Sequence, residues 1–157
     1  MIFFNLELKS KYLFQSQIGR GNIAKVKLIQ NKLTKQQFAV KIFDKIDVFN
    51  RKCIKEVIKE RRILIGNKQT DFLVYLEEAF QDREKLYLVL SNMPYGNLRK
   101  LVAKKKLFDE DQARTFSHYL GFIIINILLG LETLRRREIV HRDIKPENIL
   151  IGEDFYF

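Results

Sequence analysis

Two stretches in the first third of the chain alternate between apolar and polar residues. Their apolar positions are Val26, Leu28, Phe38, Val40 and Ile42. A period of two places alternate side chains on opposite faces of a strand, so that one face can pack on a core. The alternation therefore predicts two strands of a half-buried sheet.

Two other patterns follow along the chain. Residues 54–64 have apolar side chains at helical spacing, namely Ile54, Val57, Ile58, Ile63 and Leu64. This spacing predicts an amphipathic helix, whereas the uninterrupted apolar run at residues 86–90 is typical of a buried strand.

Composition permits one modest domain. The chain has 157 residues, of which 46% are hydrophobic, and this is enough for a core. Cys53 is the only cysteine, which excludes an intrachain disulfide and predicts a reducing, cytoplasmic location. The apolar N-terminus is too short for a signal-peptide core and is soon interrupted by Glu7.

The formal net charge of +10 raises the question of a polyanion partner. The basic residues are spread along the chain among acidic ones, with short clusters at residues 104–106 and 135–137. Such clusters are typical of solvated helix ends and loops, so we expect no nucleic-acid partner. An RNA-binding protein is the distant alternative, and it predicts salt-sensitive binding through residues 104–106.

The run His141-Arg142-Asp143-Ile144-Lys145-Pro146-Glu147-Asn148 carries the most specific chemistry. It resembles the catalytic loop of eukaryotic serine/threonine protein kinases. The resemblance implies that Asp143 accepts the proton of the attacking hydroxyl and that Lys145 stabilises charge on the transferred phosphate. Asn148 would supply an oxygen ligand to Mg²⁺. The alternative is a charged surface turn before a short apolar strand at residues 149–151.

Residues 17–26 resemble the glycine-rich loop of the same family. Gly19 and Gly21 would let the backbone close over the phosphates of ATP without an intervening side chain. Ala24 stands where the third glycine is expected, and Ile23 where an aromatic residue is common. A tight hairpin explains two glycines equally well.

Lys41 follows Gly21 by twenty residues and resembles the strand lysine that holds the α- and β-phosphates. A lysine among apolar neighbours needs a carboxylate partner. Glu60 lies where the family places that partner, and Glu56, one turn earlier, is the fallback. Alternatively, Glu60 forms only surface ion pairs, which contribute little.

Residues 91–97 resemble the hinge between the two kinase lobes. The resemblance implies that backbone groups of Ser91 and Met93 bind adenine and that Leu90 lies at the back of the pocket. Apolar side chains would sandwich the adenine ring: Ile18, Val26, Ala39 and Leu150. Each of these has core packing as its simple alternative.

The resemblance covers residues 12–157 and implies an α+β, protein-kinase-like fold. The small lobe, residues 12–90, would contain antiparallel strands and one helix. The hinge would span residues 91–97, and residues 98–157 would begin the helical large lobe.

A long helix from about residue 110 to 134 would precede the catalytic loop. It is about seven residues longer than the family pattern, and the extra residues are best placed at 121–127. As continuous helix they add about two turns, roughly 10 Å, with an angular drift of about 20°. They would then displace the loop along the helix axis unless they loop out. Our hypothesis is that residues 121–127 are foreign to the fold, such as translated non-coding sequence, and sequencing of the spliced transcript tests it.

The same segment needs burial for its isoleucines, and an extended core helix is the simplest explanation. The apolar run from Tyr119 to Leu131 is interrupted by Asn126 and is too short to span a bilayer. We therefore expect no membrane association.

The last residues, Asp154-Phe155-Tyr156, are not the magnesium-binding Asp-Phe-Gly motif of kinases. Tyr156 replaces the glycine, and Asp154 follows Asp143 by only eleven residues. Residues 152–154 are typical of a hairpin turn, so we expect the true metal-binding Asp after Phe157.

The sequence thus predicts an ATP- and Mg²⁺-dependent kinase by descent, with Ser or Thr of proteins as substrate. Without the Asp-Phe-Gly motif, these 157 residues should bind nucleotide weakly and transfer phosphate negligibly. The alternative is a non-catalytic, pseudokinase-like binding module. The motifs favour the cyclic-nucleotide-dependent or calmodulin-dependent kinase groups, and they leave the oligomeric state open.

Overall fold

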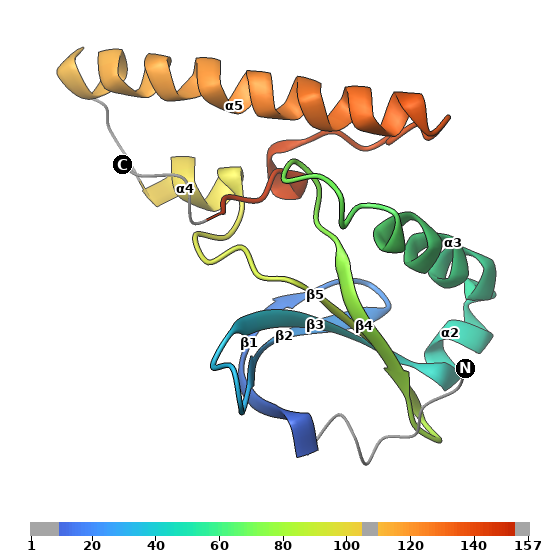
Figure 1. The fold of residues 1–157 in the computed structure, drawn as a ribbon. Coiled ribbons are helices and arrows are strands. Elements are labelled where there is room, and N and C mark those ends of the chain that lie inside the picture. Colours follow the sequence, from blue (N-terminus) through green and yellow to red (C-terminus); the bar gives the residue numbers. More distant parts are fainter. Residues whose placement is uncertain (1–9, 105–109, 153–157) are drawn as a thin grey trace. The chain divides into compact units, whose positions relative to one another are not determined.

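The chain divides into two compact units, Met1–Asn92 and Met93–Phe157. The computed structural model describes residues 10–104 and 110–152. Residues 153 and 154 of the expected hairpin turn lie outside the described residues, as do residues 105 and 106 of the basic cluster. Figure 1 shows the elements of both units.

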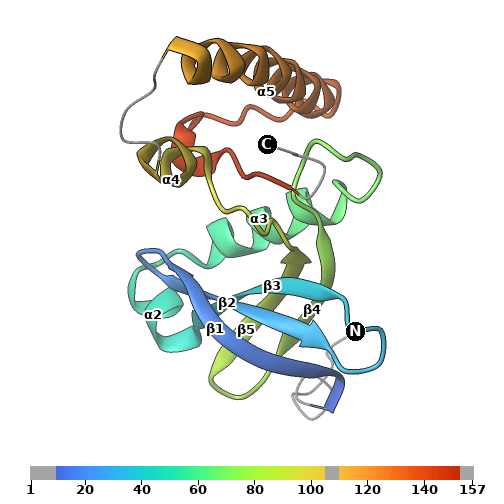
Figure 2. The ribbon, with the colours of Figure 1, turned by 90° about the vertical axis from the view of Figure 1, so that its left-hand side faces the viewer.

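The first unit contains a five-stranded antiparallel sheet in the order β1-β2-β3-β5-β4. Figure 2 shows these strands side by side. Their bounds are β1 (Tyr12–Arg20), β2 (Ala24–Asn31), β3 (Gln37–Asp44), β4 (Leu76–Gln81) and β5 (Lys85–Ser91). The strands expected from the alternating residues 26–28 and 38–42, and from the apolar run 86–90, are confirmed as parts of β2, β3 and β5.

Apolar side chains cover both faces of this sheet. One core cluster consists of Tyr12, Ile29, Phe38, Val40, Tyr87 and Val89. The other consists of Ala24, Phe43, Val48, Val57, Leu76 and Leu88. Because side chains alternate along a strand, β3 contributes even-numbered residues to the first cluster and Phe43 to the second. Burial on both faces explains why β5 has an uninterrupted apolar sequence.

Two helices follow β3. Helix α2 (Lys45–Asn50) was not expected, although Asp44 caps it by accepting the Ile46 N–H at 3.0 Å. An aspartate before the first helical residue is a recognisable start signal. Helix α3 (Ile54–Ile65) confirms the helix expected at residues 54–64.

The buried face of α3 is narrower than its apolar pattern indicated. Val57 is buried against the sheet, whereas Ile54 and Ile58 are almost half exposed. Neither of them belongs to a core cluster of the first unit. Periodicity therefore located the helix, but it did not reveal which apolar residues find a partner.

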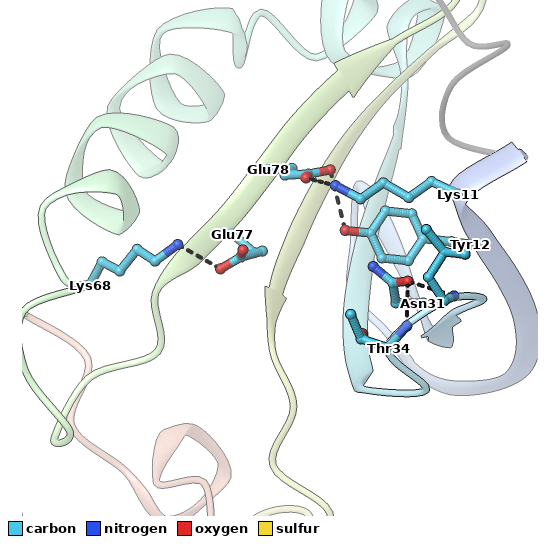
Figure 3. Close-up of polar contacts among 8 residues, drawn as sticks. Lys11, Tyr12, Asn31, Thr34, Lys68, Glu77 and Glu78 are labelled. Carbon is cyan, nitrogen blue, oxygen red and sulfur yellow. Dashed lines mark hydrogen bonds and ion pairs between the residues drawn. The ribbon is translucent and has the colours of Figure 1, made fainter.

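Side chains connect the two edge strands of the sheet. Lys11, just before β1, forms an ion pair with Glu78 on β4, and the Tyr12 hydroxyl donates to Glu78 Oε2 at 3.2 Å. Figure 3 shows these contacts beside the ion pair between Lys68 and Glu77, which is 2.8 Å long. Burial, together with the nearby Glu77 carboxylate, raises the pKa of Tyr12. The sheet is therefore curved enough to bring its first and last strands into side-chain contact.

The second unit contains α4 (Leu98–Lys104), α5 (Glu110–Arg136) and the short 3₁₀ helix η1 (Pro146–Asn148). Its small core is formed by Leu98, Ile123 and Ile151, with Leu101, Ile127 and Ile149 packed against them. Residues 149–151 pair with the start of α4, since the Leu98 N–H donates to the Ile149 carbonyl at 2.9 Å. Among these described residues the β-bridge between Asn97 and Leu150 is isolated. Residues 149–151 therefore form a single bridge and not the short strand that was considered as an alternative.

Residues 121–127 continue helix α5 and do not loop out, as Figure 1 shows. Only part of the segment is buried: Ile123 is 4% exposed, whereas Ile124 and Ile125 are more than half exposed. The expectation that the isoleucines of this segment are all buried is therefore wrong for the described unit. Within the described residues, no helix combines the length and the apolar character that a membrane crossing requires.

Candidate active site

Lys41 and Glu60 form the ion pair expected from the sequence. Lys41 Nζ donates to Glu60 Oε1 at 2.6 Å, and the two side chains are 28% and 35% exposed. Strand β3 holds the lysine, and Val57 anchors the helix that carries the glutamate. Glu60, and not the fallback Glu56, is therefore the partner of Lys41.

Three of the residues expected around adenine share one face of the sheet with Lys41. Val26 lies opposite Lys41 in the β2–β3 register, and Ala39 lies opposite Leu90 between β3 and β5. Directly opposed residues of antiparallel strands point to the same side. Val26, Ala39 and Leu90 therefore lie on the Lys41 side of the sheet. Ile18, on edge strand β1, is 41% exposed.

Neither glycine of the glycine-rich loop is required by its own backbone conformation. Among the described residues, Gly96 is the only glycine with a positive φ. A Cβ on Gly19 would lie 3.5 Å from Val26 Cβ, and one on Gly21 would lie 3.7 Å from the Ala24 carbonyl oxygen. These are ordinary contacts, so the fold itself tolerates alanine at both positions.

The expected hinge begins at the end of β5. Ser91 is buried, and its N–H donates to the Tyr75 carbonyl at 3.1 Å, so this N–H is not available to a ligand. Met93 accepts the Gly96 N–H at 3.1 Å in a tight turn, and Gly96 has φ +74°. In the described part of the chain, the Met93 N–H has no hydrogen-bond partner.

Asp143, Lys145 and Asn148 form one cluster in the second unit. Asp143 Oδ2 accepts from Lys145 Nζ at 2.8 Å and from Asn148 Nδ2 at 2.9 Å. Hydrogen bonds from Lys145 first, and then from Asn148, hold the pKa of Asp143 below its usual range. The same contact with Asp143 raises the pKa of Lys145. Arg142 has φ +65°, an uncommon conformation for a residue with a side chain.

Asn148 leaves one oxygen for a ligand. Its Nδ2 donates to both the carbonyl and the carboxylate of Asp143, so the amide oxygen points away from these bonds. An amide oxygen is a suitable ligand for Mg²⁺, which takes few protein groups and keeps several waters. Asn148 therefore fits one coordination position. Among the described residues, no three His, Cys, Asp or Glu side chains are grouped to hold a metal ion by themselves.

An ion pair connects residues 141–148 to α4. Arg99 of α4 bonds the Glu147 carboxylate, and this contact lowers the pKa of Glu147. No short-range sequence pattern points to Arg99, because 48 residues separate it from Glu147. Leu150, expected against adenine, is 44% exposed and bridges Asn97.

Comparison with known families agrees with this geometry. The model of the protein kinase domain matches residues 12–156, and the chain belongs to this family. The five-stranded antiparallel sheet with its helices is accordingly the amino-terminal lobe of a protein-kinase fold, followed by part of the helical lobe.

The chain is also similar to curated serine/threonine-protein kinases. It is 34% identical to sgk-1 of Caenorhabditis elegans over 143 residues, which cover 91% of this chain and 29% of that protein. It is 39% identical to Sgk3 of Rattus norvegicus over 142 residues, 90% of this chain and 27% of that protein. It is 34% identical to CBK1 of Saccharomyces cerevisiae over 134 residues, which cover 85% of this chain and 17% of that protein. The chain therefore spans less than a third of the length of these relatives.

Proposed function

We propose that the chain is part of a protein kinase that transfers phosphate from ATP to serine or threonine residues of protein substrates. The observation that carries the proposal is the Lys41–Glu60 ion pair, made by two elements that pack around one core. Kinases of this family use such a pair to position ATP, and they require Mg²⁺, which neutralises charge on the phosphates. The names of the relatives, all serine/threonine kinases, support the choice of substrate class.

In the first unit we assign the nucleotide-binding roles. Lys41 would bind the α- and β-phosphates, and Glu60 would hold Lys41 in place. Gly19 and Gly21 would approach the phosphates through their backbone, since the fold itself does not require glycine there. The remaining contacts would be apolar or through the backbone: Ile18, Val26, Ala39, Leu90 and Ser91.

In the second unit we assign the chemistry of transfer. The lowered pKa of Asp143 keeps its carboxylate ionised at neutral pH, ready to orient the substrate hydroxyl and accept its proton. Lys145 would stabilise negative charge on the phosphoryl group. Asn148 would hold Mg²⁺ through its free amide oxygen, and the ion would neutralise phosphate charge. Met93 would bind adenine through its N–H, and Leu150 would contact the ring.

Residues 1–157 contain no Asp-Phe-Gly motif. A polypeptide limited to these residues would therefore lack a principal carboxylate ligand for Mg²⁺. We expect that polypeptide to bind ATP weakly and to transfer phosphate negligibly. The non-catalytic, pseudokinase-like module is the outcome favoured if ATP does not bind at all.

The first test is nucleotide binding by calorimetry. Lys41→Met is expected to weaken ATP binding roughly tenfold or more, because it removes hydrogen bonds to a charged group. Lys59→Met, on an exposed position of α3, is the matched control and should leave the affinity unchanged. Equal affinities for the two variants would contradict the assignment of Lys41.

The second test is phosphate transfer by a longer polypeptide that includes an Asp-Phe-Gly motif downstream of Phe157. We expect transfer from labelled ATP to serine or threonine peptides, and a large loss in Asp143→Asn. Activity that survives this substitution would remove Asp143 from the mechanism.

A further inference from the structure

Phe43 lies directly beneath the amino group of Lys41. The two residues are two positions apart on β3 and therefore point to the same side of the sheet. Lys41 Nζ is 5.1 Å from the centroid of the Phe43 ring, within the distance at which a cation interacts with an aromatic face. The same nitrogen bonds Glu60 at 2.6 Å. The ammonium group thus has two partners, a carboxylate on α3 and a ring on its own strand.

The surroundings of Phe43 are aliphatic. The side chain is completely buried, and every other described residue of its core cluster lacks an aromatic ring. The aromatic residues of the sheet gather in the opposite cluster, where Tyr12 packs edge-on against Phe38 and Phe80. Phe43 is therefore the one aromatic residue among the described members of its cluster.

The two partners of Lys41 differ in what they depend on. The contact with Glu60 exists only while α3 is docked, whereas Phe43 lies on the same strand as Lys41 and moves with it. A lysine side chain has four rotatable methylene groups, and its ammonium is free to leave one partner for another. A ring on the same strand restricts that freedom irrespective of the position of α3.

We propose that Phe43 is a positioning residue that holds the Lys41 ammonium above β3 through a cation–π interaction. The ring keeps the ammonium where phosphate oxygens are to bind, including when Glu60 is not engaged. The expected consequence of this role, an effect on nucleotide affinity, rests on the proposed function. The contact itself is testable without nucleotide.

The contact is tested by NMR of the full 157-residue chain without ATP. Protons above the face of an aromatic ring resonate upfield, so the ε-methylene protons of Lys41 should be shifted upfield of those of the exposed Lys59. The shift should persist in Glu60→Gln, because the ring lies on the same strand as Lys41 and its contact with the amino group does not require the carboxylate. Loss of the shift in Glu60→Gln overturns the proposal, whatever the outcome for ATP binding.

The consequence is tested by site-specific replacement of Phe43 with phenylalanines carrying one, two and three ring fluorines. Fluorine withdraws electron density from the ring face and changes ring size little. The Kd for ATP should rise stepwise, by roughly 3- to 10-fold over the series, as expected for loss of a cation–π contact. The same series at Phe38, buried on the opposite face of β3, is the control and should leave the Kd unchanged.

The outcomes separate the two hypotheses. A constant Kd across the Phe43 series, with ATP still bound, overturns the positioning role and leaves the proposed function intact. If the unmodified chain does not bind ATP, the proposed function fails for this chain, and the NMR experiment still decides whether the ring holds Lys41. Thermal unfolding of each fluorinated chain confirms that the fold is retained.

Discussion

The Lys41–Glu60 pair and the cluster of Asp143, Lys145 and Asn148 each contain a lysine–carboxylate ion pair. The two sites differ in how their residues are brought together. Lys41 and Glu60 are 19 residues apart, on a strand and a helix, with side chains 28% and 35% exposed. Asp143, Lys145 and Asn148 lie within one loop, where the side chains of Asp143 and Lys145 are 59% and 48% exposed. The first site exists because a core holds two elements together. The second depends mainly on the local path of the chain.

The largest effect is expected from a cavity beneath the first site. Leu88 is 3% exposed and lies opposite Lys41 in the β3–β5 register. Leu88→Ala should lower the free energy of unfolding by about 2–4 kcal/mol, because buried leucine loses both transfer energy and packing. Urea unfolding measures the change.

The control is Leu33→Ala at an exposed position, because Leu33 is 89% exposed. This substitution should change the free energy of unfolding by less than about 0.5 kcal/mol. The NMR titration of Asp143 should be the same in Leu88→Ala as in the unmodified chain. A titration that moves with the cavity would show that the loop, too, depends on distant packing.

A smaller effect on stability is expected at a third hydrogen-bonded pair, Tyr87 and Asp82, whose residues are close in sequence and partly buried. The Tyr87 hydroxyl donates to Asp82 Oδ2 at 2.7 Å. Burial would raise the pKa of Asp82, but hydrogen bonds from Tyr87 and from the Lys85 and Glu84 N–H groups lower it overall. Tyr87→Phe should lower the free energy of unfolding by about 1 kcal/mol at pH 7.

The pH dependence follows from the sign of that shift. A carboxylate whose pKa is lowered on folding stabilises the fold above its unfolded pKa, about 4, and this contribution is lost as the pH falls further. The difference between Tyr87→Phe and the unmodified chain should therefore shrink below about pH 4. Tyr95→Phe, at a position 49% exposed, serves as control, and a difference independent of pH would contradict the role of Asp82.

Deletion of residues 121–127 should have a smaller effect still. Seven residues are about two helical turns, so the following residues rotate by only about 20°. Phe116 then takes the helical place of Ile123, and Leu120 that of Ile127, in the small core of the second unit. The unfolding free energy should change by less than about 1 kcal/mol, while circular dichroism shows the loss of helical residues.

Deletion of residues 121–125 is the matched comparison. Five residues rotate the remainder of α5 by about 140°, which should turn Leu134, now buried, toward solvent. Equal stability of the two deletions would show that the buried face of α5 does not depend on helical phase.

The smallest effect on stability, and the most specific one, is expected from Lys145→Ala. The Lys145 contact is the leading cause of the lowered pKa of Asp143, so the substitution should raise that pKa toward its usual value. Carbon-13 NMR of the Asp143 carboxyl measures the shift, and unfolding should be unaffected. Lys100→Ala on α4 is the control, and an unmoved Asp143 titration would assign the lowered pKa to Asn148 and His141.

Sequence patterns predicted all residues of the Asp143 cluster but only some of the residues around Lys41. The catalytic-loop motif placed Asp143, Lys145 and Asn148 together because they are neighbours in sequence. The resemblance to the kinase family also favoured Glu60 over Glu56, and the structure shows the contact with Lys41. The pattern did not reveal the ring beneath Lys41, although the i, i+2 spacing of Phe43 was a signal for it.

Other features of the structure were not predicted, because the sequence signals for them are weak or because the residues involved are far apart in the chain. The cap at Asp44 was visible, but the helix it begins is short and follows directly on a strand. Ile54 and Ile58 fit the apolar face of α3 and yet remain half exposed. Arg99 and Glu147, like Lys11 and Glu78, come from separate parts of the chain, and no short-range pattern connects them.

The sequence by itself determined the family, the strand and helix periods, and the order of the motifs, because these depend on local spacing. Only the tertiary structure decided that Lys41 bonds Glu60 and lies above Phe43. It also decided that residues 121–127 lengthen a continuous helix with one isoleucine buried and others exposed. The physical reason is that burial and pairing depend on which surfaces meet when elements pack, and a linear pattern specifies only which surfaces are available.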